Sequence, residues 1–468
     1  MKRSLTFVLP FTLSLVFFEA LLLYAQTATN TPASNPQTNP PNASQGNVMT
    51  EELKTSPNAG TRAKAARELG KARDASAVPA LAEALSDPSE KVRREVVLAL
   101  AQIHQAETLD PLIKATQDSN EEICVLAVQS LVGYYTGTVP SPGFSGFVKK
   151  NWQRAKGHFN PDTTRIDPGV SAEPKVITAL DATLKSTRST RASCEAAKGL
   201  GTLVARAAVP DLIKSAHSSD ETLSLEALNA LSKIKDRSAG PQLVDLLDSP
   251  DEEIKRQACV TIGVLRTGQA APKLQSIYEN GTDPKSQEKA LEGLAYLGAP
   301  TSVPLFTKAL GSDDKAMRAS AAEGLARAGD PKAIPELEKA AAVERDAEVR
   351  LAIEFAMTAL GKLDYLSDLV NELSSKTHGD VAQTYLIELA RAPGFLSRLY
   401  PNLQNPNAAV RKKLCIVLMF SGDQTTLDQL DRLSHDPDGD VAAQALQAKR
   451  GLRARVAAAG TTPTAGSP

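Results

Sequence analysis

The chain has 468 residues, of which 42% are hydrophobic and only 4% aromatic, so small apolar side chains must fill most of any core. Its 53 Lys and Arg residues nearly balance 54 Asp and Glu residues, giving a formal net charge of −1. This balance excludes the basic excess that is typical of nucleic-acid-binding proteins, and we expect no nucleic-acid partner.

The amino terminus has the layout of a secretory signal peptide. Lys2 and Arg3 precede a mostly apolar run at residues 4–23, and the chain turns polar after Ala25. This order predicts that residues 1–25 are cleaved off. The run is nearly long enough to cross a bilayer, so an uncleaved anchor is the alternative and the only membrane contact that we expect. Either way, the sequence predicts an exported bacterial protein, periplasmic or associated with the cell envelope.

Two polar segments flank the rest of the chain. Residues 26–50 are rich in Thr, Asn, Pro, Ser and Gln and carry no charge, and residues 457–468 have a similar composition. Segments of this kind bury too little apolar surface to fold. We therefore predict a disordered linker at 26–50 and a disordered tail at 457–468.

Between these segments, over residues 51–456, one pattern recurs about every 31 residues. Neighbouring copies are 29–33 residues apart, except for one gap of 69 residues. A fixed period of this length predicts a solenoid, in which each unit contacts mainly its neighbours. The equivalent positions are Thr61, Val92, Ile123, Ala192, Leu223, Ile254, Gln287, Met317, Val349, Val381, Val410 and Val441.

Residues 87–117 show what one unit contains. Apolar residues in the segment 92–103 fall largely at helical spacing, which predicts an amphipathic helix. A few breaker residues follow, and then a second short helix begins near Pro111. Because the connection is so short, the two helices must pack against each other. The sequence therefore predicts an all-α fold built from helix pairs.

Each helix of the pair has a marker at its start. An Asp or Ser lies five residues before the aligned position and a Glu lies two residues before it, which predicts an N-cap and its partner. Proline is favoured in a first helical turn and marks the second helix. The cap pairs are Asp87/Glu90, Asp118/Glu121, Ser218/Glu221 and Ser249/Glu252, and the prolines are Pro79, Pro111, Pro174, Pro210, Pro241, Pro272, Pro304 and Pro335.

A cation often follows the aligned position directly. The simplest interpretation is that each of these cations forms an ion pair with a nearby acid of the neighbouring unit, so that the cations make a row of ion pairs along the stack. The alternative is a phosphate-binding stripe, which the balanced total charge disfavours. The row consists of Arg62, Arg93, Lys255, Arg318, Arg350 and Arg411.

The segments 92–103, 317–340 and 349–361 resemble HEAT repeats, in particular the short HEAT-like repeats of bilin lyases. The resemblance covers roughly residues 57–455. It implies an α-solenoid, a right-handed superhelix of about 12 antiparallel helix pairs, which usually binds proteins along its concave side. The His-Glu dipeptides that mark the iron-binding HEAT-like hydroxylases are absent from this sequence.

The wide gap in the repeat pattern contains an insertion at residues 136–173, although a degenerate repeat is possible there. The insertion holds the only Trp of the protein, with further aromatic residues and cations around it. Aromatic residues and Arg commonly anchor protein interfaces. Two hypotheses compete: its rings fold back and pack on the stack, or they are presented to a partner or a membrane surface, where they would act as anchors. The predicted partner-binding residues are Phe144, Phe147, Lys149, Lys150, Trp152, Arg154 and Phe159.

No pattern in the sequence predicts a catalytic residue, a cofactor-binding residue or a metal ligand. The five histidines are scattered, and the acidic run at 436–440 fits an inter-repeat turn better than a calcium loop, because the required Gly and Glu positions are Val441 and Gln447. Four cysteines lie on first helices of different repeats, near core positions, and are predicted to be buried and unpaired. They are Cys124, Cys194, Cys259 and Cys415.

These observations favour a non-enzymatic scaffold of the cell envelope, without a cofactor, that binds a protein or peptide partner along the solenoid surface. Two alternatives remain. One is a cofactor-handling enzyme of the bilin-lyase-like class, which the repeat resemblance suggests. The other is a purely structural envelope component.

Overall fold

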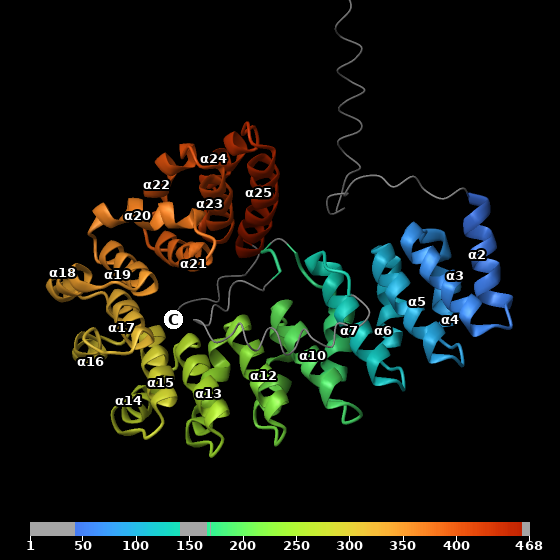
Figure 1. Cartoon of the computed structure of the whole chain (residues 1–468), viewed down its shortest axis with the longest axis horizontal. Helices are drawn as coiled ribbons and strands as arrows, with labels where there is room; N and C mark the ends of the chain where they lie inside the picture. The colour runs from blue at the N-terminus through green and yellow to red at the C-terminus, as the bar shows by residue number, and fades with distance from the viewer. Residues whose placement is uncertain (1–42, 141–165, 169, 461–468) are drawn as a thin grey trace, which may run out of the picture.

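The computed structural model describes residues 43–140, 166–168 and 170–460. The described residues form helices and contain no strand, and the helices follow one another in chain order along a curved stack (Figure 1). The predicted leader, residues 26–42 of the predicted linker and the last eight residues lie outside the described residues. None of the described helices is long and apolar enough to cross a membrane.

Each aligned position lies in or beside the first turn of a long helix. The first helix of the chain, α2 (Ala43–Thr55), precedes them. The long helices are α3 (Ala59–Ala72), α5 (Glu90–Ile103), α7 (Glu121–Thr136), α10 (Thr190–Thr202), α12 (Glu221–Ile234), α13 (Glu252–Val264), α15 (Pro284–Leu297), α17 (Lys315–Ala328), α19 (Ala347–Ala359), α21 (Gly379–Ala390), α23 (Ala408–Ser421) and α25 (Gly439–Gly460).

A short helix follows each long helix up to α23, usually after one 3₁₀ turn. These short helices are α4 (Val78–Ala84), α6 (Leu109–Ala115), α9 (Pro174–Leu184), α11 (Val209–Ala216), η5 (Arg237–Asp248), α14 (Ala271–Asn280), α16 (Val303–Ala309), α18 (Ile334–Val343), α20 (Leu366–Asn371), α22 (Leu396–Leu399) and α24 (Thr426–Leu433). The predicted all-α solenoid of paired helices is therefore confirmed.

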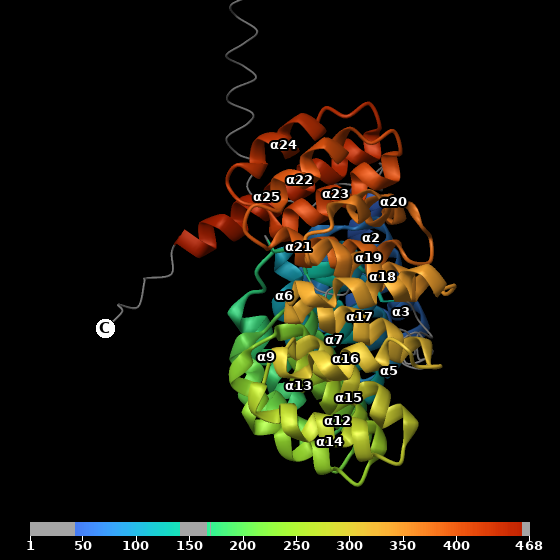
Figure 2. The same cartoon turned by 90° about the vertical axis from the view of Figure 1, so that its left-hand side faces the viewer.

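The two kinds of helix form two layers. Around the bend of the stack, the short helices α14, α16, α18 and α20 lie on the outside of the curve and the long helices on the inside (Figure 1). Figure 2 looks onto this outer layer, where the same four short helices follow one another from bottom to top. Long helices pack directly against the long helices of the next unit, so the inner layer is continuous.

Small residues allow the long helices to approach closely. A Cβ atom built on Gly263 of α13 would lie 2.4 Å from the carbonyl oxygen of Gly293 on α15, and one on Gly201 of α10 would lie 2.7 Å from the Cα of Ala230 on α12. One core cluster runs from Leu53 to Leu452. This core consists mainly of Ala, Leu and Val, as the composition predicted. Each further unit of the stack extends the core.

The predicted segment boundaries need three corrections. Helix α2 begins at Ala43, inside the predicted linker, because Met49 and Leu53 anchor it on the core. Helix α25 extends to Gly460, past the predicted start of the tail, because its alanines favour helix. Within the predicted insertion, Ile166 is buried and its backbone N–H donates to the Thr202 carbonyl at 3.0 Å, so the stack itself holds this end.

The predicted N-caps were wrong by two residues. The actual caps directly precede the helices, and most of their side chains accept backbone hydrogen bonds from the first turn, as Asn120 does from Glu122 and Ile123; Ser89 before α5 makes no such bond. The predicted residues instead accept a hydrogen bond from the backbone N–H of the actual cap residue, with Asp87 bound to Ser89 and Asp118 to Asn120, both at 2.8 Å. Ser218 and Ser249 do the same for Asp220 and Asp251.

Proline occupies the first turn of the second helix, as predicted, in six units. These prolines are Pro79, Pro174, Pro210, Pro272, Pro304 and Pro335. Pro111 is the third residue of α6. The prediction was wrong at Pro241, which lies inside the 3₁₀ segment η5, so this unit has no second α-helix.

Candidate interaction surface

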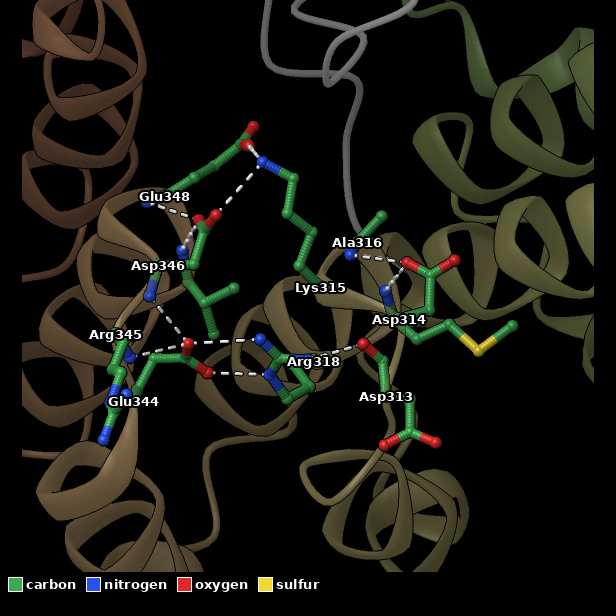
Figure 3. Close-up of polar contacts among 11 residues, drawn as sticks. Asp313, Asp314, Lys315, Ala316, Arg318, Glu344, Arg345, Asp346 and Glu348 are labelled. Carbon is green, nitrogen blue, oxygen red and sulfur yellow. Dashed lines mark hydrogen bonds and ion pairs between the residues drawn. The ribbon is translucent and has the colours of Figure 1, made fainter.

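The predicted row of cations forms ion pairs between units, and we call each such pair an arginine clasp. In Figure 3, Arg318 at the start of α17 donates Nε and Nη2 to the Glu344 carboxylate of the next turn at 2.7 and 3.1 Å. Its Nη1 donates to the carbonyls of Ser312 and Asp313. The same geometry recurs in the pairs Arg62–Asp87, Arg93–Asp118 and Arg411–Asp436.

The acid of each clasp is itself held by the turn. Glu344 accepts from the backbone N–H groups of Arg345 and Asp346, both at 2.9 Å, and Lys315 bridges to Asp346 and Glu348 of the next unit (Figure 3). Because the guanidiniums of the four clasps already bind carboxylates and carbonyls, they are not available as a phosphate-binding stripe. The ion-pair interpretation is confirmed at these four positions.

Two members of the row behave differently. Lys255 pairs with Glu252 of its own helix at 2.7 Å. Arg350 is exposed, and the corresponding residue of the next turn, Ser375, has no carboxylate. A clasp therefore forms where both the arginine and the acid 25 or 26 residues later are present.

The clasps predict a loss of stability at acidic pH. The hydrogen bonds from Arg411 hold the pKa of Asp436 below its ordinary value, and the clasp partner likewise lowers the pKa of Glu344. A carboxyl group whose pKa is lower in the folded than in the unfolded chain stabilises the fold at neutral pH. That contribution is lost as the pH falls below about 4.

We expect the double variant Arg318→Met/Arg411→Met to lose about 1 kcal/mol of unfolding free energy per clasp at pH 7. Its melting temperature should fall less than that of the wild type between pH 7 and pH 3, because fewer lowered carboxyl pKa values remain. Circular dichroism melts measure both effects. The control is Arg350→Met, which removes an arginine at the equivalent position of a unit that has no clasp. It should change neither the stability at pH 7 nor the dependence of the melting temperature on pH. An equal loss of stability in this control would show that the clasps do not stabilise the fold.

Units in the middle of the stack replace the clasp arginine with a small side chain. Cys124, Ser193 and Ser224 occupy its position, and each donates to a carbonyl near the end of the preceding short helix, such as Ser224 Oγ to the Ala216 carbonyl at 2.6 Å. Beside Cys124 this leaves a polar cavity of about 40 Å³, which has Arg188 in its wall. The cavity has room for one or two water molecules.

The four cysteines are free, as predicted, and lie on four different long helices. Cys124, Cys259 and Cys415 are buried, and Cys194 is half-buried. Burial raises the pKa of the Cys124 thiol to about 11 and that of the Cys259 thiol to about 12. Among the described residues, no three His, Cys, Asp or Glu side chains are placed to hold a metal ion.

The acidic run at 436–440 is an inter-unit turn, as predicted. Asp438, the residue before α25, accepts from the backbone N–H groups of Asp440 and Val441. Asp436 accepts from the N–H of Asp438 and binds Arg411.

A buried polar cluster joins four long helices at the bend of the stack, and sequence reasoning did not find it. Arg327 of α17 donates Nε and Nη2 to Glu388 of α21 at 2.9 and 3.1 Å, and Nη1 to Glu323 at 2.9 Å. Tyr385 of α21 donates its hydroxyl to Glu323. We call this group the bend cluster; its other members are Tyr296 of α15 and Phe355 of α19.

Aromatic rings enclose the Arg327 guanidinium. Its Cζ atom lies 4.6 Å from the Tyr296 ring centroid and 5.7 Å from that of Phe355, which stacks on Tyr385 at 4.3 Å. The Arg327 side chain is 6% exposed. Burial, with the nearby Glu323 carboxylate, raises the pKa of Tyr385 well above its ordinary value. The cluster therefore fastens α17 to α21 across the intervening helix α19.

A second aromatic group lies where the insertion leaves and rejoins the stack. The Tyr135 hydroxyl accepts from the Glu173 backbone N–H at 3.0 Å, and Tyr134 contacts both the Tyr135 ring and the His104 ring, with centroids 5.1 and 5.0 Å away. The seven predicted partner-binding residues, from Phe144 to Phe159, lie outside the described residues, so their role stays a prediction.

Comparison with known proteins agrees with this architecture. The paired helices and continuous core define an α-solenoid repeat protein. A family model described as HEAT repeats matches residues 47–132, 177–263 and 271–358. Because these matches cover more than half of the sequence, the chain belongs to the HEAT-repeat family. No curated protein matches it.

Solved structures with similar folds are distant in sequence. The complex of CpcE and CpcF of phycocyanin lyase from Nostoc sp. PCC7120 is 19% identical, with 59% of this chain and 92% of that chain covered and a TM-score of 0.35. Importin beta is 13% identical, with 87% and 64% covered and a TM-score of 0.41. The karyopherin Kap121p bound to the SUMO protease Ulp1p is 13% identical, with 86% and 48% covered and a TM-score of 0.39. These likenesses concern the fold alone.

Proposed function

We propose that this HEAT-repeat protein is a non-enzymatic scaffold that binds a protein or peptide partner along its solenoid surface. The observation that carries the proposal is the continuous inner layer of long helices, in which equivalent helices of consecutive units lie side by side. A partner that contacts several units buries more interface area with every unit that it contacts, while a few anchor residues supply most of the binding affinity.

The contacts that the buried polar side chains make support a binding role over a catalytic role. The clasp arginines, the bend cluster and the three buried cysteines are engaged in contacts within the stack. These groups therefore stabilise the surface, and exposed residues of the helices and turns are left to recognise a partner.

The proposed location is outside the cytoplasm, in the periplasm or at the cell envelope. The support is the signal-peptide layout of residues 1–25. The proposed anchor of the partner is the aromatic and basic group around Trp152, together with Tyr134 at the base of the insertion.

The test is capture of partners by the full chain from a native envelope extract, quantified by mass spectrometry against a variant in which a short Gly-Ser linker replaces residues 141–165. We expect specific partners that the variant captures at least about tenfold less, as the loss of an anchor cluster implies. The variant keeps Ile166 and Tyr135, so its helical content and melting temperature should match the wild type. Unchanged capture would refute the role of the insertion, and the absence of any specific partner would refute the scaffold.

A further inference from the structure

One position of the long helices has the same environment along the stack, with a single exception. From α3 to α23, the eighth residue of the helix is apolar and fully buried in every long helix but α19. In α19 this residue is Glu354, which is half-buried. A carboxyl group therefore occupies a position that is otherwise part of the core. The apolar residues are Ala66, Val97, Val128, Ala197, Leu228, Cys259, Leu291, Ala322, Leu386 and Cys415.

The packing of the inner layer is sparsest at the same place. Helices α19 and α21 contact each other less than any other neighbouring pair of long helices. The short helix between them is broken into α20 and the 3₁₀ segment η10 (Glu372–Ser374), and the next short helix is broken in the same way into α22 and η11 (Tyr400–Gln404). We call the contact region of α19, α20, η10 and α21 the joint. The bend cluster bridges the joint, because it connects α17 with α21.

Glu354 has further carboxylates around it in the joint. Asp368 of α20 and Glu372 of η10 act on it, while the exposed Arg350, one turn earlier on α19, has the smallest influence of the three. Glu372 also lies 3.2 Å from Nδ1 of His378. Burial, with the carboxylates of Asp368 and Glu372, raises the pKa of Glu354 to about 7. Ionisation of Glu354 therefore puts like charges on both sides of the joint.

The other elements that pack on α19 do not balance this charge. Asp364 and Tyr365 of the 3₁₀ turn η9 (Leu363–Tyr365) lie beside Lys362. Every charged residue of α17, α18 and α21 is already in an ion pair. These pairs are Lys315–Glu348, Arg318–Glu344, Arg327–Glu323, Arg327–Glu388, Lys339–Glu336, Lys362–Glu338 and Lys413–Asp380.

We propose that the joint is a pH-sensitive hinge: protonation of Glu354 lets α20 and η10 pack closely on α19, and its ionisation drives them apart and frees the units from α21 to α25 to swing. The position of α25 depends on this hinge. The stack turns back on itself around the joint, so that α25 reaches the segment that follows the insertion (Figure 1). There Gln447 donates a side-chain hydrogen bond to Asp167, 280 residues earlier in the chain. One such bond adds little stability, so it opens when the joint loosens.

Thermal melts test the effect of the proton on stability. Because the pKa of Glu354 is raised in the folded chain, the folded chain binds this proton more tightly than the unfolded chain. The resulting stabilisation is complete below about pH 4 and is lost as the pH rises through about 7. We therefore expect Glu354→Gln to melt about 2–4 °C higher than the wild type at about pH 8.5, and to differ less from it at about pH 5.5.

Small-angle scattering of the purified chain tests the motion, and no partner is needed for it. The radius of gyration of the wild type should rise between about pH 5.5 and about pH 8.5, with a midpoint near pH 7. Glu354→Gln should keep the smaller value throughout. Glu354→Leu restores the apolar residue of the other units and should behave in the same way, so it replaces the Gln variant if that variant does not fold.

Two controls separate Glu354 from its neighbours. Asp364→Asn removes an exposed acid from η9 and should keep the pH dependence of the wild type. His378→Gln should keep it as well, and loss of the pH dependence in this variant would assign the transition to His378 and overturn the proposal. A wild-type radius of gyration that does not change with pH, the same change in Glu354→Gln, or lower melting temperatures of both Glu354 variants at about pH 8.5 would each overturn it too.

Discussion

The substitution Arg327→Ala is expected to reduce the free energy of unfolding by about 3–5 kcal/mol, the usual cost of removing one partner from a buried ion pair. Arg327 forms ion pairs with both Glu323 and Glu388, and Glu323 is 5% exposed. Without the guanidinium, a buried carboxylate is left uncompensated and the Tyr296 ring loses its cation. The contact between α17 and α21 across α19 should open as well.

Urea titration followed by circular dichroism measures the stability, and small-angle scattering measures the curvature. We expect an earlier unfolding transition and a larger radius of gyration in the folded baseline. Arg350→Ala removes an exposed arginine from the next long helix and should leave both quantities within experimental error. A stability loss below about 1 kcal/mol for Arg327→Ala would show that the bend cluster does not hold the bend.

The second large effect is expected from Gly263→Ala, which should cost about 2–3 kcal/mol although it adds a single methyl group. The new Cβ atom would lie 2.4 Å from the Gly293 carbonyl oxygen and 2.6 Å from the Gly293 Cα. Both atoms belong to the backbone of α15, so no side-chain rotation relieves the clash. Helices α13 and α15 must separate, and the strain spreads along the inner layer.

Thermal melts of Gly263→Ala and Gly268→Ala separate packing from helix propensity. Gly268 follows in the next turn, and a Cβ atom there meets no atom within 4 Å, so this substitution should be neutral within about 0.5 kcal/mol. Equal melting temperatures for the two variants would contradict the close approach of the long helices.

Most of the fold could be predicted from the repeat period of the sequence. Apolar spacing and proline position predict the long and short helices because both depend on local physics, which each unit repeats. The arginine clasps were predictable for the same reason, since each arginine and its acid are about one period apart. The predicted caps failed because Asp87 and Asp118 are better placed to close the turn, and the signal that was overlooked is the Asn, Ser or Asp directly before most of the long helices.

The bend cluster could not be predicted, because Arg327 and Glu388 are 61 residues apart, two units rather than one. Such a contact depends on the curvature of the whole stack, which no local pattern encodes. The left-handed residues that end several long helices were equally hidden, since Arg73 or Lys235 at a helix end resembles an ordinary cation near a helix C-terminus. The predicted anchors around Trp152 await the binding experiment.

The most direct test of the central claim, that consecutive units together hold a partner, is hydrogen exchange of the full chain with and without its captured partner. The account predicts slower exchange at equivalent places of at least three successive units. Protection confined to one unit, or no protection in the presence of a saturating partner, would contradict it.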